Sequence, residues 1–347
     1  MNILLIGIGV IGQRHIRNIK SNFKRIKFYT INSKHSKQVY GINKPLVGDV
    51  NSKYNLKTIN FDDINKKIKI DAAFICLPNY LHSRFLKKLV DQNVHVFLEK
   101  PGGVNNRDLK LLKQIQKQNR KNKTQIMLGY HLRFNPVIIK LKKMIKNKIV
   151  GNILNVLAEN GEHIADYRSY QKYWKVYHAK KNEGGGTSLN QIHEIDYLLY
   201  LFEDYDFKLV NTFHDKISDI KVDTEDSISS NFIVSKFKEK FLTTLLLNSY
   251  ERPKNRSLKI VGSKGKIVAD LLKNNIKIYQ FKSSNNGIMK NRKILKKNFQ
   301  YKFKRNNLFI NEIKYFIQTL KKNKSIDKKY GLNKSIKALE LTLKLKK

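Results

Sequence analysis

The apolar run Asn2-Ile3-Leu4-Leu5-Ile6 leads directly into Gly7-Ile8-Gly9-Val10-Ile11-Gly12. Three glycines at this spacing, between a strand and a helix, are typical of a dinucleotide-binding loop. The first permits a tight turn, the second lets the backbone approach a pyrophosphate, and the third allows the helix to pack closely on the strand. The amino terminus of that helix supplies N–H groups for the phosphates. The stretch predicts a parallel α/β domain that binds a dinucleotide through Gly7, Gly9, Val10, Ile11 and Gly12, with a ligand-free glycine turn as the alternative.

A second apolar run, Val94-His95-Val96-Phe97-Leu98, leads into Glu99-Lys100-Pro101. Ligands of open parallel sheets bind outside the carboxyl ends of the strands, so we expect Glu99 and Lys100 to lie beside the cofactor. The proline restricts the lysine backbone, and Glu99 is placed to orient or pair with the ammonium. Lys100 could polarise a carbonyl or hold a substrate hydroxyl during hydride transfer. In isolation it could equally be a surface lysine of a lysine-rich chain.

Two further strand ends bear on the cofactor. The segment Phe28–His35 has no acidic residue to bind the ribose 2′-hydroxyl of NAD. Asn32, Ser33 and Lys34 stand there instead. Ser33 and Lys34 could bind the 2′-phosphate of NADP, which would favour NADP over NAD. Because lysine is common throughout the chain, NAD stays open.

The turn after the next strand is expected to pack against the nicotinamide ribose. Pro78 ends that strand, and Asn79 is expected to cap the following helix. The residues of this turn are Leu77, Pro78, Asn79 and His82.

The bulk properties indicate a two-domain globular protein. A chain of 347 residues exceeds one ordinary domain, and its hydrophobic content is 41%. No apolar stretch approaches the ~20 residues that span a bilayer, so no membrane association is expected. Cys76 is the only cysteine, which excludes an intrachain disulfide and a cysteine-rich zinc cluster. The opening run lacks the basic start of a signal peptide, so a cytoplasmic location is expected.

The formal net charge is +43, with 70 Lys and Arg residues against 27 Asp and Glu residues. Such a charge normally points to nucleic acid. Here the excess is mostly lysine, spread along the chain together with many Asn and Ile residues, which is typical of a compositional bias at solvated positions. Nucleic-acid readers concentrate Arg and aromatic residues on one face. We therefore expect no nucleic-acid partner, although the field would attract anionic ligands.

Up to about residue 122, apolar strands alternate with amphipathic helices, as in a parallel sheet. We expect a Rossmann domain over residues 1–122 and an α/β domain over residues 123–347, with Gly129–Pro136 as the crossing segment. The expected strands are Ile3–Ile6, Lys27–Ile31, Ala72–Leu77, Val94–Leu98 and Thr124–Leu128, and the expected helices are Val10–Lys20, His82–Gln92 and Asn105–Asn119.

The second domain is expected to hold a large, mostly antiparallel open sheet, because alternating apolar positions dominate from Phe207 to Phe303. An aromatic loop is expected between Gly161 and Tyr177. The expected helices are Val137–Lys146, a helix from the triple glycine Gly184–Gly186 to Phe202, Leu308–Lys321 and Leu332–Lys344.

The segment Gly184–Asp196 carries a third candidate group. A helix starting there, capped by Thr187 or Ser188, would place Gly186, Asn190, His193 and Tyr197 on one face. His193 is then a candidate acid–base group for an alcohol–ketone conversion, although a histidine taken alone is more often structural. Only Glu194 and Asp196 lie near it in sequence, so no metal site is expected.

Five segments occur in an order that resembles one known family. They are Gly7–His15, Asp71–His82, Glu99–Pro101, Gly129–Pro136 and Gly184–Asp196. Together they are similar to the glucose–fructose oxidoreductase/inositol dehydrogenase (Gfo/Idh/MocA) family. The resemblance covers nearly the whole chain. It implies an NAD(P)-binding Rossmann domain, followed by an α/β domain whose open sheet commonly forms dimers or tetramers. It also implies that Lys100 and His193 serve substrate binding and proton transfer.

Two departures from the family pattern bear on the site. Asn190 stands where the family often has an acidic residue near the histidine. Its amide can hydrogen-bond a substrate hydroxyl but cannot act as a base. Gly102 and Gly103 after the Glu-Lys-Pro motif are also unusual, and we expect them to loosen that turn.

The aromatic loop is similar to that of a subgroup associated with bacterial surface-sugar pathways. Trp174 and Tyr177, with Arg168 and Glu162, suit a polyhydroxylated ring or a nucleotide sugar. The aromatic side chains could equally pack the loop against the sheet.

These observations predict an NAD(P)-dependent oxidoreductase acting on a hydroxyl or keto carbon of a sugar, cyclitol or nucleotide sugar. His193 would take the hydroxyl proton while Lys100 steadies the carbonyl oxygen. Arg133, Asn135 and Arg168 are second-rank candidates for orienting substrate or cofactor. The alternative is a non-catalytic sensor of the same fold that binds a dinucleotide and regulates a partner.

Overall fold

The computed structural model describes residues 1–31, 38–41, 45–122, 124–167, 170–280 and 295–346, and it divides the chain into two compact units. The first unit comprises Met1–His131, Arg168–Gly185 and Arg305–Leu343. The second comprises Leu132–Tyr167, Gly186–Lys304 and Lys344–Lys347. Each unit is assembled from three separate segments of the chain, whereas each of the expected domains, 1–122 and 123–347, is one continuous segment.

The first unit is built on a six-stranded sheet in the order β5-β2-β1-β6-β7-β8, and all its pairings are parallel. The order reverses direction between β1 and β6, so the loops that follow these two strands meet at the switch point where such sheets bind ligands. The strands are β1 (Asn2–Ile6), β2 (Lys27–Ile31), β5 (Leu56–Ile59), β6 (Ala72–Ile75), β7 (His95–Leu98) and β8 (Ile126–Leu128).

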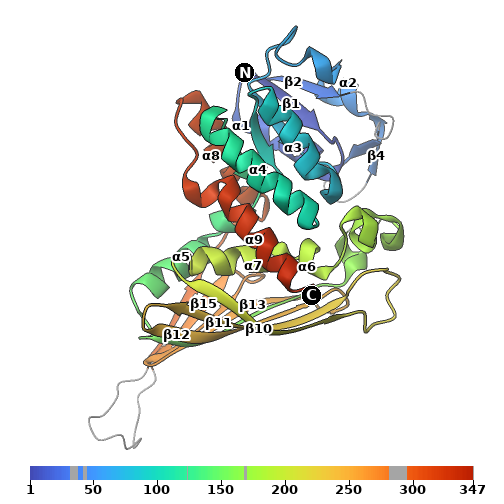
Figure 1. Cartoon of the computed structure of the whole chain (residues 1–347). Coiled ribbons are helices and arrows are strands. Elements are labelled where there is room, and N and C mark those ends of the chain that lie inside the picture. The colour runs from blue at the N-terminus through green and yellow to red at the C-terminus, as the bar shows by residue number, and fades with distance from the viewer. Residues whose placement is uncertain (32–37, 42–44, 123, 168–169, 281–294, 347) are drawn as a thin grey trace, which may run out of the picture. The chain divides into compact units, whose positions relative to one another are not determined.

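Helices from both ends of the chain belong to the first unit. The helix α1 packs on α8, and α3 packs on α4. In Figure 1 the red helices α8 and α9 lie beside the helices of the amino-terminal segment of this unit, and Lys113 of α4 pairs with Glu340 of α9 at 2.8 Å. The helices are α1 (Val10–Asn22), α3 (His82–Asp91), α4 (Asn106–Asn122), α8 (Asn306–Lys321) and α9 (Leu332–Lys344).

An aromatic cluster joins α8 to the sheet of the first unit. Phe74 of β6 and Phe97 of β7 stack with centroids 4.9 Å apart, and both meet the edge of Phe316 at 5.7 Å. All three rings are buried. Helix α8 therefore completes the core of a sheet whose strands end about 180 residues earlier in the sequence.

The second unit contains an eight-stranded sheet in the order β10-β11-β12-β9-β13-β14-β15-β16. Only β12 and β9 pair in parallel; the other neighbours are antiparallel. The strands are β9 (Ile153–Gly161), β10 (Asp206–Asp215), β11 (Ser227–Lys236), β12 (Glu239–Asn248), β13 (Asn255–Gly262), β14 (Gly265–Asp270), β15 (Asn275–Gln280) and β16 (Leu295–Gln300). The parallel first sheet and the mostly antiparallel second one confirm the expected fold class.

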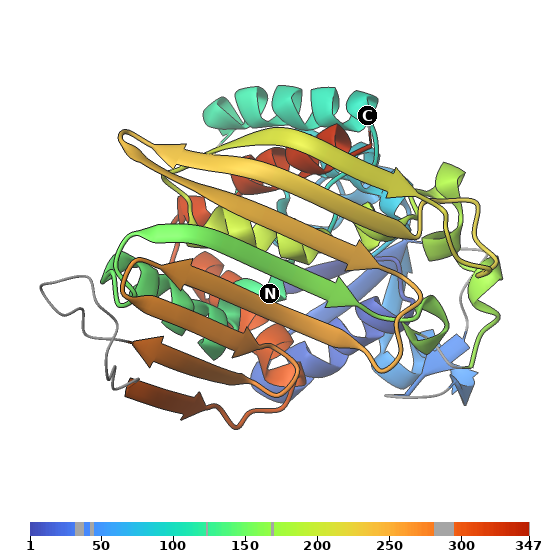
Figure 2. The ribbon, with the colours of Figure 1, turned by 90° about the horizontal axis from the view of Figure 1, so that it is seen from below.

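One face of the second sheet is buried under α5 (Pro136–Lys146) and α7 (Ile192–Leu201), and the opposite one we call the outer face. Figure 2 looks onto the outer face, where no helix of the second unit lies in front of the strands. Alternation along the strands places Leu157, Ile233, Leu242 and Leu246 there, none of them buried.

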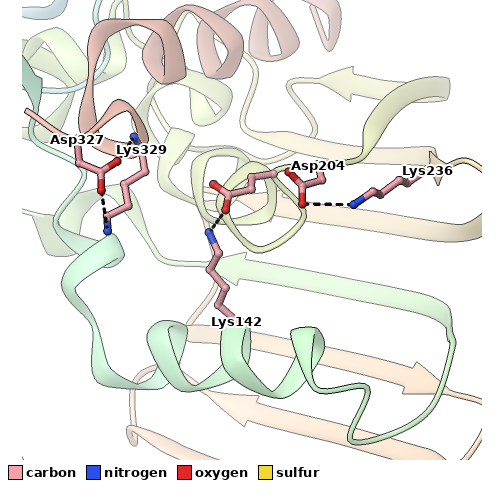
Figure 3. Close-up of polar contacts among 6 residues, drawn as sticks. Lys142, Asp204, Lys236, Asp327 and Lys329 are labelled. Atoms are coloured by element: carbon pink, nitrogen blue, oxygen red, sulfur yellow. Dashed lines mark hydrogen bonds and ion pairs between the residues drawn. The ribbon is translucent and has the colours of Figure 1, made fainter.

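Exposed ion pairs offset part of the positive charge (Figure 3). Lys142 of α5 contacts Glu203 at 2.7 Å, and Lys236 contacts Asp204 at 3.4 Å. Asp327 pairs with Lys329 at 3.1 Å in the first unit. Exposed pairs of this kind contribute about 0–1 kcal/mol each, so packing and not charge holds these helices.

Several elements differ from the expectations. The central strand β9 and the strand β5 were not expected, nor was the hairpin of β3 (Gln38–Tyr40) and β4 (Pro45–Asp49). The helix expected from Gly186 to Phe202 is interrupted at Gln191, giving α6 (Thr187–Asn190) and α7. Nearly all residues of both pieces are buried, including Asn190, His193 and Tyr197, which were expected to share one face of a single helix. Among the described residues, no helix is long and apolar enough to cross a membrane.

Candidate functional site

The glycine loop joins β1 to α1 at the switch point of the first sheet. Gly7 has φ +93°, and a Cβ there would lie 2.6 Å from the carbonyl of Cys76. A Cβ on Gly12 would lie 2.1 Å from Gly7 O. Gly9 differs, because nothing lies within 4 Å of a Cβ added there, and it precedes α1 without a side-chain cap. The loop is tightly built at Gly7 and Gly12 and open at Gly9.

These features fit the pyrophosphate of a dinucleotide. At Gly9 the backbone can approach phosphate oxygens, since a side chain would otherwise fill the open space. The first turn of α1, with Val10 and Ile11 half-buried, directs its N–H groups out of the helix end. The cofactor-binding candidates Asn32, Ser33 and Lys34, of which the last two were expected to favour NADP, lie outside the described residues.

Buried side chains hold the turn after β6. Asn79 donates from Nδ2 to Gly184 O at 3.0 Å, and α3 has no side-chain cap, so the expected cap by Asn79 is wrong. His82 lies between two carbonyls, with Nδ1 2.6 Å from Pro101 O and Nε2 2.8 Å from Leu77 O. Burial lowers the pKa of His82, and a neutral ring donates to only one of these carbonyls. His82 thereby ties the turn after β6 to the turn after β7.

Glu99 and Lys100 follow β7, and the peptide bond between Lys100 and Pro101 is cis. Glu99 Oε1 lies 2.6 Å from Nε2 of His15, a residue of α1 for which no role was predicted. Burial raises the pKa of Glu99, but the hydrogen bond and charge of His15, followed by the charge of Lys100, lower it below its ordinary value. The carboxylate is therefore ionised between His15 and the half-buried Lys100.

Gly102 and Gly103 were expected to loosen the turn after the Glu-Lys-Pro motif, but they do not. A Cβ on Gly102 would lie 2.7 Å from Ser335 Oγ, and one on Gly103 would lie 2.4 Å from Asp108 Cβ. Both glycines are buried. They allow α4 and α9 to pack closely on the chain after Pro101, which makes the turn tighter.

The aromatic segment after β9 belongs in large part to the first unit. Tyr170 packs against Tyr40 with ring centroids 6.2 Å apart, and Tyr177 stacks on His178 at 3.9 Å. Trp174 is 40% exposed. Trp174 and Tyr177 stay candidates for contact with a substrate ring, whereas Arg168 lies outside the described residues.

In the second unit, a distant loop holds the start of α6. Glu225 Oε1 accepts hydrogen bonds from Ser188 Oγ at 2.6 Å and Ser188 N at 3.2 Å, and Thr187 Oγ1 donates to Glu225 O at 3.1 Å. The N-cap itself is Gly186, with no side-chain cap. The expected cap by Thr187 or Ser188 is therefore wrong, since both hydroxyls bond to Glu225.

Asn190 and His193 lie on either side of the break at Gln191, and both are buried. The helix α7 is fixed to the sheet by the next residue, Glu194, whose Oε1 accepts from Arg256 Nε of β13 at 2.6 Å. This contact holds the backbone that carries His193. His193 belongs to the second unit, and Lys100 belongs to the first.

Two of the second-rank candidates have structural partners. Arg133 is 1% exposed, and its guanidinium donates to both oxygens of Asp196 at 2.5 and 2.8 Å. Asn135 is the N-cap of α5, where its Oδ1 accepts from Val137 N at 2.8 Å. This burial and pairing favour structural roles for Arg133 and Asn135 over contact with substrate.

Two residues around the candidate site, His15 and Glu225, were not predicted from the sequence. His15 lies one helical turn after Gly12, and this spacing was the available signal. Nothing near Glu225 in the sequence connects it to Ser188. Within the described part of the chain, no group of three His, Cys, Asp or Glu side chains could hold a metal ion.

Two family descriptions match the chain. "Oxidoreductase family, NAD-binding Rossmann fold" (GFO_IDH_MocA) matches residues 1–130, and "Oxidoreductase family, C-terminal alpha/beta domain" matches residues 142–342. Among curated proteins, the chain is 26% identical over 160 residues to an uncharacterized oxidoreductase of Bacillus subtilis, covering 46% of this chain and 44% of that protein. It is 22% identical over 230 residues to inositol 2-dehydrogenase of Salmonella typhimurium, covering 64% and 60%. The chain thus matches about half the length of these relatives.

The fold also matches solved structures over nearly their whole length. UDP-N-acetylglucosamine 3-dehydrogenase from Acidithiobacillus ferrooxidans superposes with a TM-score of 0.73 at 14% identity, covering 99% of this chain and 96% of that one. Myo-inositol 2-dehydrogenase from Lactobacillus plantarum gives a TM-score of 0.73 at 17% identity, covering 100% and 96%. At these identities the likeness establishes the fold.

Proposed function

Because this chain belongs to the Gfo/Idh/MocA oxidoreductase family, we propose that it is an NAD(P)-dependent dehydrogenase or reductase. Its substrate would be a sugar, cyclitol or nucleotide sugar, and the reacting carbon would carry a hydroxyl or keto group. The relatives named inositol 2-dehydrogenase and glucose-6-phosphate 3-dehydrogenase support this substrate class.

The glycine loop is the observation that carries the proposal. Gly7 and Gly12 leave no room for a side chain, while the space at Gly9 stays open beside the amino terminus of α1. This combination serves close approach of a pyrophosphate and has no evident packing purpose at Gly9. Lys100 follows β7 of the same sheet, which is separated from β1 by β6, at the carboxyl ends of the strands where such ligands bind.

When bound, the nicotinamide would accept or donate the hydride. In the oxidising direction, the imidazole of His193 would accept the proton of the substrate hydroxyl. Lys100 Nζ would donate a hydrogen bond to the same oxygen as it becomes a carbonyl oxygen. In the reducing direction His193 would return the proton. Asn190, Trp174 and Tyr177 would contact hydroxyls and ring faces of the substrate.

Two further expectations belong to this proposal. The outer face of the second sheet would form a homodimer or homotetramer, because Leu157, Ile233, Leu242 and Leu246 leave apolar surface there. A cytoplasmic location and a preference for NADP over NAD rest on the amino-acid composition and on Ser33 and Lys34.

Titration of the purified protein with NADPH and NADH, followed by fluorescence of the reduced nicotinamide, tests the cofactor. Micromolar binding supports the proposal, and turnover is then sought with a panel of sugars, cyclitols and nucleotide sugars. Binding without any turnover would favour the sensor function. Folded protein that binds neither cofactor would contradict both functions.

A matched pair of alanine variants makes the titration specific for the glycine loop. Gly9→Ala places a methyl group in the open space and should weaken binding at least about tenfold, since the pyrophosphate needs that approach. Gly331→Ala also adds a methyl group without a close contact, the nearest atom being Asn333 Oδ1 at 3.4 Å, and should bind like wild type. Equal binding by all three proteins would contradict the assignment.

A further inference from the structure

His15 has no part in the proposed reaction, yet it lies at the centre of the first unit. It is fully buried on α1, one turn after Gly12. The rings of Phe74, Phe97 and Phe309 surround it at centroid distances of 5.5, 5.2 and 6.5 Å. A basic side chain in such an aromatic setting is costly unless it has a polar partner.

That partner is Glu99, the residue before Lys100. His15 Nε2 lies 2.6 Å from Glu99 Oε1, and Glu99 is 8% exposed. Burial raises the pKa of this carboxyl, but the hydrogen bond and charge of His15 and the charge of Lys100 bring the pKa of Glu99 below its ordinary value. The pair therefore fixes a negative charge on the residue next to Lys100 in the chain, and the two charges interact.

Other ionisable groups interact with Glu99 from several elements. The groups whose charges interact with Glu99 are Arg14 of α1, Cys76 after β6, His82 of α3, Lys100 itself and Glu312 of α8. His15 differs from these groups in contacting the Glu99 carboxylate through a hydrogen bond of 2.6 Å. Arg14 instead lies over the ring of Phe309, 4.6 Å from its centroid.

We infer that His15 is a positioning residue for Lys100, acting through Glu99. By holding the Glu99 carboxylate ionised and fixed, it keeps the Lys100 ammonium charged and directed from the turn after β7. The contact also joins α1, which follows the glycine loop, to the turn that carries the lysine. The part of Lys100 in hydride transfer rests on the proposed function, whereas the coupling of His15 to Lys100 does not.

Chemical reactivity of Lys100 measures this coupling without cofactor or substrate. The protein is treated briefly with acetic anhydride at a series of pH values, and acetylation of the Lys100 peptide is quantified by mass spectrometry. In His15→Leu, Glu99 loses its hydrogen bond and takes up a proton, so Lys100 holds its own proton less tightly. Its acetylation near pH 8 should then rise about three- to tenfold, with the pH profile displaced to lower pH. The exposed Lys57 of β5 is the internal control and should not change.

Three further variants separate this coupling from a general loss of structure. His15→Gln can place its amide near the position of Nε2 and should restore wild-type reactivity of Lys100. His15→Asn places its amide near the position of Nδ1 instead and should behave like His15→Leu. Glu99→Gln should raise reactivity to the same extent, and combining it with His15→Leu should add nothing.

Unchanged Lys100 reactivity in folded His15→Leu, or equal reactivity in the Gln and Asn variants, would overturn the inference. If His15→Leu does not fold, the Gln and Asn variants decide the question between them. Failure of NADPH and NADH to bind would contradict the proposed function and leave this coupling intact. The two ideas are therefore tested by separate measurements.

Discussion

At the scale of single residues, Glu312 of α8 is the least expected side chain. It is fully buried, and neither carboxyl oxygen has a hydrogen-bond partner among the described residues. Burial, and then the negative charge of Glu99, raise the pKa of Glu312 well above its ordinary value, against the opposing charge of Arg14. The folded protein therefore holds a proton here that the unfolded chain releases.

This proton makes the cost of Glu312 depend on pH. A carboxyl whose pKa is raised by folding contributes fully below the unfolded pKa of about 4.3, and its contribution is lost as pH rises. Glu312→Met should therefore increase the free energy of unfolding by about 1–3 kcal/mol at pH 8 and by less at pH 4.5. Urea denaturation at both pH values checks this.

A surface acid provides the comparison for Glu312. Glu340→Met removes a half-exposed carboxylate that pairs with Lys113, and its effect should stay within about 1 kcal/mol at both pH values. An equal dependence on pH in the two variants would show that net charge, and not the buried carboxyl, is responsible.

Arg133 is the residue whose structural and substrate roles can be separated most clearly. Arg133→Met leaves Asp196 buried without its bidentate partner and should cost about 3–5 kcal/mol of unfolding free energy. The double variant with Asp196→Leu should recover most of this loss. Unchanged stability with a raised KM for substrate would instead assign Arg133 to the substrate.

At the scale of elements, α5 tests whether Asn135 is a cap. Asn135→Ala should lower the free energy of unfolding by about 0.5–2 kcal/mol, because Val137 N loses its acceptor at the helix start. Asn135→Ser retains an acceptor and should lose less. Thermal or urea melts measure both variants, and equal stability of all three proteins would rule out the capping role.

The elements that could be predicted from the sequence are those with one strong local signal. The glycine loop, the strand β2 and the helix α9 appear with their expected boundaries or nearly so, because apolar periodicity and flanking turns agree there. The strand β9 was missed because Asn155, Glu159 and Asn160 interrupt its apolar pattern. Its position between β12 and β13 depends on long-range pairing, which the local sequence does not encode.

The candidate site divides in the same way. Glycine positions follow from backbone geometry and could be predicted: Gly7 and Gly12 leave no room for a Cβ, and Gly9 lies beside open space. Side-chain partners such as His15 with Glu99, or Ser188 with Glu225, join residues 84 and 37 positions apart. Local spacing therefore suggested caps at Asn79, Thr187 and Ser188 that tertiary contacts replace.

At the scale of the whole molecule, the outer face of the second sheet predicts self-association. Leu242 and Leu246 on β12 are 42% and 37% exposed in the single chain. Replacing both with lysine should convert the proposed dimer or tetramer to monomer, since each buried leucine contributes about 1.5–3 kcal/mol. Light scattering coupled to size-exclusion chromatography measures the mass.

Val47 of β4 serves as the control for self-association. It is a fully exposed apolar residue in the first unit, so Val47→Lys should leave the mass unchanged. A wild-type protein that is monomeric at micromolar concentration would contradict the proposed interface directly.

The packing of α8 on the first sheet also has a consequence during protein synthesis. Phe316 closes the aromatic cluster over Phe74 and Phe97, and Phe309 lies beside His15. A ribosome that has made residues 1–131 has released every strand of this sheet but not the helix that covers its core. The nascent chain therefore keeps that apolar surface uncovered until α8 (Asn306–Lys321) has also been synthesised. Chaperone demand should accordingly last through the roughly 180 residues that separate β8 from α8.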